Sequence, residues 1–208
     1  MRGVRSFFAV FFIFAFMAGN SYAAYAGEPM DQVRHTVDKV LDILKDKELK
    51  KPAKTKERRT AIRKIVSERF DFEEMGKRSL GLHWRKRTPD ERKEFVPLFS
   101  DLIERSYIKK IETYTDEKIL YVAEKVDGGY SEVNTKIVTK RNVEIPVEYR
   151  LLKKDGKWEV YDVVIEGVSL VNNYRTQFNK IIRTDSYEEL VKRMKNKQEE
   201  ELFEEKAK

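Results

Sequence analysis

In the first half of the chain, apolar residues recur every three to four positions, which is the spacing of one helix face. The first such stretch opens at Pro29, and its apolar positions are Val33, Val37, Val40, Leu41 and Leu44. The second has its apolar face at Ile62, Ile65, Val66 and Phe70. The longest predicted helix begins at Thr88-Pro89-Asp90-Glu91, where Thr88 is the cap and Glu91 completes a capping box. Its wide apolar face predicts contact with a substantial interior.

After about residue 116 the apolar positions alternate with polar ones, which is typical of strands. Four strands are predicted, at Ile119–Val126, Tyr130–Lys140, Val143–Lys153 and Lys157–Ile165. Asp127-Gly128-Gly129 and Asp155-Gly156 favour hairpin turns between them. The third strand has one apolar face and one charged face, so helices must cover one side of the sheet.

Two further helices are predicted after the strands. Ser169 or a neighbour caps the first, whose apolar positions are Leu170, Val171, Tyr174, Phe178, Ile181 and Ile182. Ser186 and Glu189 have the spacing of a capping box at the start of the second. Helices, then antiparallel strands, then helices predict an α+β fold, in which a sheet curves over its helices.

The first 26 residues have the pattern of a secretory signal. Arg2 and Arg5 form a positive start, Phe7 to Ala18 is an apolar run, and small residues follow at Ala23 and Ala26. A membrane anchor is the alternative, but this run is short for roughly 30 Å of hydrocarbon. We expect cleavage, with Ala26 favoured over Ala23 as the last residue removed. Residues 27–194 would then form one domain, followed by a charged tail at 195–208.

Charge and cysteine content narrow the function classes. The formal charge of the 208 residues is +7, and without Arg2 and Arg5 it is 41 − 36 = +5. Charged residues make up 38% of the chain with both signs mixed, which favours a soluble surface over a nucleic-acid-binding one. A basic face toward anionic lipid headgroups stays open. The chain has no cysteine, so disulfides and thiolate sites are excluded.

Two glycine-rich stretches resemble catalytic motifs only in part. Gly76 to Gly81 has the first spacing of a phosphate-binding loop, but Leu82 and His83 stand where lysine and serine or threonine are needed. Gly167-Val168-Ser169 has the start of a nucleophile elbow, but Val171 replaces its second glycine. We interpret both as turns, with Ser169 as a helix cap.

The remaining candidate groups also lack a catalytic arrangement. His83 has no second histidine or cysteine at a metal-ligand spacing, so we interpret it as structural. Asp162 and Glu166 would lie about 13 Å apart on one strand face, which is wide for a carboxylate pair acting on one bond. A single buried carboxylate acting as a proton shuttle is the open alternative. We predict no catalytic residue, no metal and no cofactor.

Four ordered motifs resemble the MlaC family, also called toluene-tolerance proteins. They are FDFEEMGKRSLGLHW (Phe70–Trp84), TPDERKEF (Thr88–Phe95), VEYRLLKKDGKWEVYD (Val147–Asp162) and YDVVIEGVSLVNNYRTQFNKII (Tyr161–Ile182). The resemblance covers Pro29 to about Met194. Members of this family are the periplasmic phospholipid-binding components of the Mla lipid-transport system.

This resemblance implies an NTF2-like or cystatin-like fold, with a curved antiparallel sheet wrapped around helices and a deep apolar pocket. It implies a non-enzymatic periplasmic shuttle for a glycerophospholipid, whose acyl tails lie inside and whose headgroup stays near the mouth. The implied partners are the MCE-domain protein of an inner-membrane ABC transporter complex and an outer-membrane lipoprotein associated with porins. No nucleic acid is expected.

We expect the lipid-binding residues on two helices, the strands and the glycine-containing segment Phe72–Trp84, which is a candidate flap. They are Phe72, Met75, Leu80, Trp84, Phe95, Phe99, Leu102, Tyr107, Val147, Tyr149, Leu151, Val163, Ile165, Val168, Leu170, Tyr174 and Phe178. Arg175 is a candidate partner for a lipid phosphate or for Asp162 and Glu166. Each apolar residue could instead fill a solid core, and a filled core would favour a periplasmic protein-interaction or chaperone module.

Overall fold

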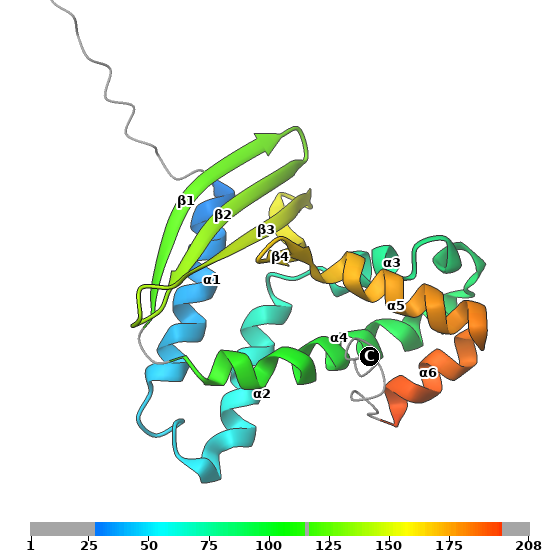
Figure 1. The fold of residues 1–208 in the computed structure, drawn as a ribbon, viewed down its shortest axis with the longest axis horizontal. Coiled ribbons are helices and arrows are strands. Elements are labelled where there is room, and N and C mark those ends of the chain that lie inside the picture. The colour runs from blue at the N-terminus through cyan, green and yellow to red at the C-terminus, as the bar shows by residue number, and fades with distance from the viewer. Residues whose placement is uncertain (1–27, 115–116, 197–208) are drawn as a thin grey trace, which may run out of the picture.

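The computed structural model describes residues 28–114 and 117–196 (Figure 1). The helices of the first half are α1 (Glu28–Lys45), the short 3-10 helix η1 (Pro52–Lys54), α2 (Thr55–Ser67), α3 (Phe72–Leu80), the 3-10 helix η2 (Gly81–Lys86) and α4 (Pro89–Glu112). The strands are β1 (Lys118–Asp127), β2 (Tyr130–Val138), β3 (Glu144–Lys154), β4 (Lys157–Ile165) and β5 (Val168–Ser169), and helices α5 (Leu170–Thr184) and α6 (Tyr187–Lys195) follow. The predicted signal segment and nearly all of the charged tail lie outside the described residues.

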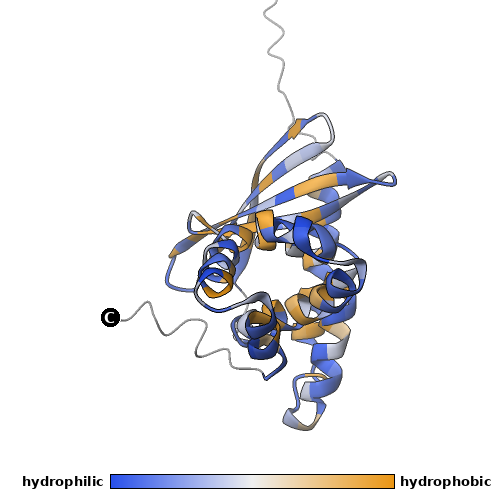
Figure 2. Ribbon diagram, turned by 90° about the vertical axis from the view of Figure 1, so that its right-hand side faces the viewer, coloured by the Kyte–Doolittle hydropathy of each residue, from blue (hydrophilic) through white to orange (hydrophobic). Residues whose placement is uncertain are grey.

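The sheet is an antiparallel meander with strand order β1-β2-β3-β4-β5. Its first four strands match the predicted ones to within two residues at each end, and the two-residue β5 was not predicted. The hairpin turns contain left-handed backbone at Gly128, with φ of 56°, and at Gly156, with φ of 79°. In Figure 2 the helices lie on one side of this sheet. The predicted α+β class is therefore confirmed.

Helix α1 lies against the sheet, behind β1 and β2 in Figure 1. Its Met30 and Val33 are buried among apolar side chains of the strands. The N-terminus of α1 is held by polar contacts, because the Met30 N–H donates to the Glu124 carboxylate of β1 at 2.6 Å. The Trp158 indole of β4 donates to Glu28 at 3.3 Å. Sheet and α1 thus form one packed unit.

Helices α3, α4, α5 and α6 form a separate layer around an aromatic core. The rings of Phe95 and Phe99 on α4 lie 5.8 Å apart between centroids, and both contact Phe178 of α5 edge-on. Gly76 allows α3 to approach closely, since a Cβ there would lie 3.3 Å from the Phe95 ring. We call the buried residues of this layer the helical cluster: Met75, Leu80, Trp84, Phe95, Phe99, Leu102, Ile103, Val171, Tyr174, Phe178, Ile181, Tyr187, Leu190, Val191 and Met194.

The predicted helix starts are confirmed. The Thr88 hydroxyl accepts from the Glu91 N–H at 3.2 Å, and the Glu91 carboxylate accepts from the Thr88 N–H at 2.7 Å. Ser186 caps α6 by accepting from the Glu189 N–H at 3.1 Å. These bonds satisfy backbone donors that the first helical turn leaves unpaired.

An ion cluster joins the end of α4 to α2. Glu112 accepts from the guanidinium groups of Arg58 and Arg59, each at 2.7 Å, and its side chain is 13% exposed. The hydrogen bond from Arg59, together with that from Arg58, holds the pKa of Glu112 below its usual range. A carboxyl pKa that is lower in the folded state stabilises the fold above the unfolded-state pKa. This stabilisation is lost as pH falls through the folded-state pKa.

We therefore expect Glu112→Gln to lower the free energy of unfolding at neutral pH by about 1–3 kcal/mol, the usual range for a hydrogen bond to a charged group. The difference from the unsubstituted protein should shrink as pH falls below the ordinary glutamate range. Urea unfolding at several pH values measures it. Glu57→Gln on α2 is the matched control, because its ion pair with Lys54 is exposed and should contribute little. A pH-independent difference would contradict the assignment.

Candidate functional site

The sheet turns one continuous apolar face toward α1 and α4. The strand register places Thr135 beside Tyr121 on one side and Val147 on the other, and Val147 beside Ile165. Directly opposed residues share a face of the sheet. We call this surface the inner face, formed by Tyr121, Val133, Thr135, Ile137, Ile145, Val147, Tyr149, Leu151, Val160, Val163 and Ile165.

The inner face is packed unevenly along its length. Leu151 and Val133, toward the β3–β4 hairpin, have no exposed surface. Ile137, Ile145 and Ile165, toward the other end, are only partly buried. The accessible apolar surface of the inner face is therefore concentrated at the end of the sheet where β2 turns into β3.

Two tyrosines on the inner face lie in surroundings that disfavour an ionised side chain. Burial raises the pKa of Tyr149 to about 12, although the side chain keeps some accessible surface. Burial also raises the pKa of Tyr121. The Tyr121 hydroxyl is buried and has no hydrogen-bond partner among the described residues. An apolar surface with few polar groups suits a mostly hydrocarbon ligand.

The inner face meets the helical layer through few side chains. Tyr107 of α4 and Phe70, just before α3, pack against both the helical cluster and the inner face. Burial raises the pKa of Tyr107, in agreement with its position between the two. These two aromatic residues thus mark the boundary between the sheet and the helical layer.

The structure divides the predicted lipid-binding residues into two groups. The strand residues and Leu170 belong to the inner-face side: Val147, Tyr149, Leu151, Val163, Ile165 and Leu170. The helix residues pack with one another in the helical cluster: Phe72, Met75, Leu80, Trp84, Phe95, Phe99, Leu102, Tyr174 and Phe178. Tyr107 contacts both groups. The helical group therefore has the contacts of a closely packed core, and its lipid-binding role stays a prediction.

Val168 belongs to neither group. It lies opposite Ile165 on the two-residue edge strand β5 and is 55% exposed. The sequence reasoning also left out Tyr121, Ile137 and Ile145, which lie on the inner face. Their alternation with polar residues was the available signal, but alternation identifies a buried face without showing what covers it.

The turn from β4 to α5 is built around Asp162. The Ser169 hydroxyl donates to its Oδ2 at 2.6 Å and the Val171 N–H to its Oδ1 at 3.0 Å. Ser169 in turn accepts from the Asn172 N–H at 3.0 Å, which confirms it as the cap of α5. Arg150 approaches Asp162 at 3.5 Å, and Asp162 is 4% exposed. Both carboxylate oxygens are engaged, so Asp162 anchors the helix to the sheet.

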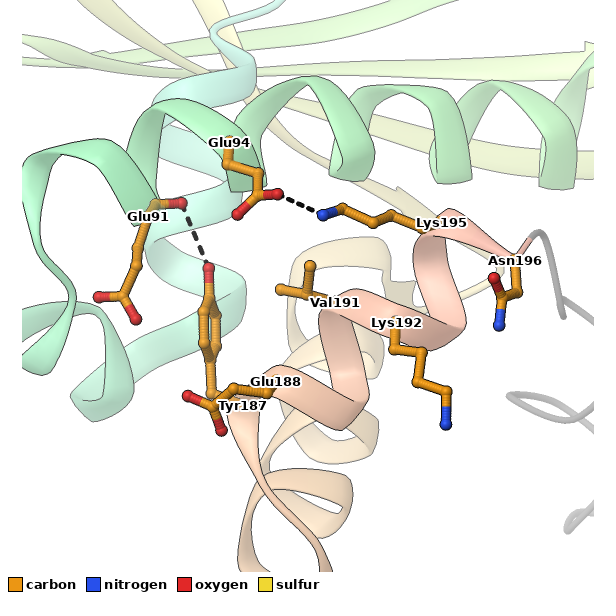
Figure 3. A pocket seen from close by; sticks show the side chains of 8 residues that line it. All are labelled: Glu91, Glu94, Tyr187, Glu188, Val191, Lys192, Lys195 and Asn196. Carbon is orange, nitrogen blue, oxygen red and sulfur yellow. Dashed lines mark hydrogen bonds and ion pairs between the residues drawn. The ribbon is translucent and has the colours of Figure 1, made fainter.

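Two surface hollows among the described residues have charged linings. One, of about 430 Å³, lies between the start of α4 and α6 (Figure 3). In it Tyr187 donates to the Glu91 carbonyl at 3.2 Å, and Lys195 pairs with Glu94 at 2.5 Å. The other, of about 330 Å³, lies on the outer side of the Asp162 turn. Neither lining suits acyl chains.

The described residues include no cluster of three or more His, Asp or Glu side chains that could hold a metal ion. His83 lies 3.0 Å from the Asn179 amide oxygen, which accords with the structural role predicted for it. None of the described helices combines the length and the apolar character needed to cross a bilayer.

Comparisons with known proteins agree with this geometry. The sequence profile of the family described as MlaC protein matches residues 34–196. The intermembrane phospholipid transport system binding protein MlaC of Haemophilus influenzae is 26% identical over 141 residues, which cover 65% of this chain and 66% of that protein. Toluene tolerance protein ttg2D of Pseudomonas putida is 24% identical over 155 residues, covering 74% of this chain and 72% of that protein.

A solved structure supports the fold. The phospholipid-binding protein from Ralstonia solanacearum, in complex with a phospholipid, matches with a TM-score of 0.74 at 22% sequence identity. The match covers 85% of this chain and 99% of that one. At this identity the likeness establishes the shared fold.

The hydrogen bond between Ser169 and Asp162 predicts that substitutions of these two residues have non-additive effects on stability. We expect Asp162→Ala to lower the free energy of unfolding by about 2–3 kcal/mol, because it leaves buried donors unpaired. Ser169→Ala alone should lose about 1 kcal/mol as a helix cap. Because the two side chains bond to each other, the double variant should lose less than the sum, by more than about 0.5 kcal/mol. Urea unfolding measures all three, and strict additivity would show that the two residues act separately.

Proposed function

The chain belongs to the MlaC family, and we propose that it is a periplasmic shuttle that carries a glycerophospholipid between the inner and outer membranes. The apolar, partly accessible inner face is the observation that carries this proposal. The matched proteins named for phospholipid transport and phospholipid binding support it. The proposed cargo site lies between the inner face, α1 and α4.

The physical task of such a shuttle is to keep hydrocarbon out of water. Each exposed CH₂ costs about 0.8 kcal/mol, so two ordinary acyl chains amount to roughly 20 kcal/mol or more. A protein that shelters them needs apolar surface and few polar groups. The half-buried residues Ile137, Ile145, Tyr149 and Ile165 offer such surface. The unpartnered Tyr121 hydroxyl is suited to an ester oxygen near the glycerol.

The helical layer is attached to the sheet by hydrogen bonds at β4, which makes it easier for the site to open elsewhere. The Asp71 N–H donates to the Val160 carbonyl at 3.0 Å, and the Val160 N–H donates to the Arg69 carbonyl at 2.8 Å. These bonds and the Asp162 anchor all involve β4. Tyr107, by contrast, meets the inner face through apolar contact. We propose that α4 separates from the inner face at Tyr107 while β4 keeps the layers joined.

This replaces the predicted flap as the moving part. The segment Phe72–Trp84 forms α3 and η2, with Met75, Leu80 and Trp84 buried in the helical cluster. A glycine-containing stretch is therefore compatible with a firmly packed helix, and the apolar contact at Tyr107 is the weaker boundary.

The filled-core alternative has one specific observation in its favour. The aromatic rings of the helical cluster contact one another closely, with Tyr174 and Phe178 5.5 Å apart between centroids. A protein-interaction or chaperone module would share that feature. It would have no use for partly accessible apolar residues along the inner face.

The proposal also includes the cellular location of the protein and its partners. Residues 1–26 would direct the chain to the periplasm, where an MCE-domain ABC transporter complex and an outer-membrane lipoprotein–porin complex would exchange lipid with it. The proposed activity needs no catalysis, cofactor or nucleic acid. Direction would come from these partners, because the chain has no complete nucleotide-binding motif.

Lipid content tests the proposal directly. The protein recovered from the periplasmic fraction of expressing cells should carry phospholipid, detected by native mass spectrometry and by organic extraction. Ile145→Asn should reduce the lipid affinity about tenfold or more, because an amide would face acyl chains without a partner. Leu120→Asn is the matched control and should retain the lipid, because Leu120 is 45% exposed on β1 and lies beside Lys136 on the other face of the sheet.

Two results would reject the proposal in its present form. A folded protein that is repeatedly free of lipid would favour the filled-core alternative. Equal loss of lipid in Ile145→Asn and Leu120→Asn would show that the inner face is not the binding surface.

A further inference from the structure

One surface of the helical layer carries cations without acidic neighbours in sequence. Residues 75–89 contain Lys77, Arg78, Arg85, Lys86 and Arg87 but no Asp or Glu. Residues 167–184, which include α5, contain Arg175, Lys180 and Arg183 and again no Asp or Glu. In a chain where 38% of residues are charged and the signs are mixed, two such stretches stand out.

The two stretches form one surface in the folded protein. The His83 ring of η2 lies 3.0 Å from the Asn179 amide oxygen of α5. Gly81 lies against the Arg175 side chain, whose Cδ would be 3.3 Å from a Cβ on that glycine. Figure 1 shows the loop between α3 and α4 beside α5, at the end of the molecule away from β1 and β2. We call this surface the basic ridge and define it by Leu82, Arg85, Lys86, Arg175 and Arg183.

Among the described residues, the cations of the basic ridge have no carboxylate partner. Arg85, Lys86 and Arg183 are exposed, and no carboxylate of the described residues pairs with them. The Arg175 guanidinium donates to the Asn172 amide oxygen at 2.5 Å rather than to a carboxylate. Lys77 and Arg78 on α3 are, by contrast, both paired with Glu74 at 2.8 Å. Unpaired cations gathered on one surface attract an anionic one.

The ridge also presents an apolar side chain to solvent. Leu82 is 77% exposed, the highest value among the large exposed apolar side chains of the described residues. The loop is held at Trp84, two residues further on, which is 7% exposed and lies under the Arg92 guanidinium at 5.1 Å. Arg92 also donates to the Trp84 carbonyl at 3.2 Å. The loop is thus fixed in a shape that leaves Leu82 exposed.

We propose that the basic ridge docks on the surface of a bilayer that contains anionic phospholipids. Leu82 enters the headgroup region and reaches the upper part of the acyl chains, while Arg85, Lys86, Arg175 and Arg183 lie against phosphates. A single projecting apolar residue surrounded by cations on long stems suits a soft interface of this kind. A protein partner would instead need carboxylates matched to fixed positions. This docking involves the outer surface only, so it holds or fails independently of lipid carriage.

Vesicle binding of the protein tests the electrostatic part. The probe is a vesicle of equal parts phosphatidylglycerol and phosphatidylcholine, compared with phosphatidylcholine alone, in a sedimentation assay at moderate salt. Each cation near an anionic surface changes the partition coefficient about fivefold. The double substitution Arg85→Gln and Lys86→Gln should therefore weaken binding about 25-fold. Added salt should reduce the difference, because it screens exposed charges.

The matched control removes the same charge elsewhere. Lys47 and Lys50 are exposed between α1 and η1, and no carboxylate of the described residues pairs with either. The double substitution Lys47→Gln and Lys50→Gln gives the same net charge as the test variant but should change binding less than about twofold, since distant charges are screened. All variants share the same N-terminal segment, so differences between them report only the changed residues.

Leu82→Ser tests the apolar part. It should weaken binding about tenfold, because a leucine that enters the interface loses its exposed apolar surface. Val126→Ser is its control: Val126 is 50% exposed on β1, outside the ridge, and its substitution should have little effect. Both sites are exposed, so folding should be retained, which circular dichroism checks.

Three results would overturn the proposal. The protein could show no preference for anionic over neutral vesicles. The two double variants could lose binding equally, which would mean that net charge alone is responsible. Vesicle binding could also be unchanged by all ridge substitutions, which would assign the ridge to a protein partner instead.

Discussion

The arrangement of the whole molecule depends on how β4 holds the helical layer. Its Val160 exchanges backbone hydrogen bonds with the chain on either side of Phe70, and its Asp162 binds the first turn of α5. Directional bonds of this kind fix distance and orientation, and a buried carboxylate cannot lose them without a large penalty. The sheet and the helical layer are therefore joined firmly along one line.

Around Tyr107 the two layers meet by apolar contact, which has no preferred direction and adjusts to new neighbours. Tyr107 is the side chain of α4 that packs on the inner face. Acyl chains that entered beside it would replace one apolar neighbour with another, so little contact energy would be lost. The same exchange at β4 would break hydrogen bonds that hydrocarbon could not replace. The proposed cargo site thus lies at the contact between the two layers that can open with the smallest loss of interaction energy.

Local sequence signals predicted most of the secondary structure. Thr88 with Glu91, Ser169 and Ser186 act as caps within a few residues of their helices, and the four main strands follow from alternation. Contacts between residues far apart in the sequence were harder to predict. The pattern of Phe95 or Phe178 shows that each is buried, but it contains no information about which other face lies opposite. The division into an inner face and a helical cluster therefore required the structure.

Val168 and Leu82 are two residues whose exposure to solvent could not be predicted from the sequence. Both are apolar residues two positions away from buried ones, and sequence reasoning placed Val168 in the pocket and passed over Leu82 as part of a turn. Their exposure depends on their place in the fold: Val168 lies on the short edge strand β5, and Leu82 lies at the start of the 3-10 helix η2.

In the proposed scheme, membrane docking and the sheltering of acyl chains belong to two different surfaces of the molecule. On one surface, the two requirements would conflict. A surface that grips a membrane must expose apolar and cationic groups, whereas a surface that shelters acyl chains must stay out of water. The basic ridge belongs to η2 and α5, and the inner face lies on the far side of the attachment along β4. Docking would thus act on the layer that has to move away from the inner face, while the cargo surface itself stays covered. Because both layers remain tied through Val160 and Asp162, movement at Tyr107 would open the site without unfolding the protein.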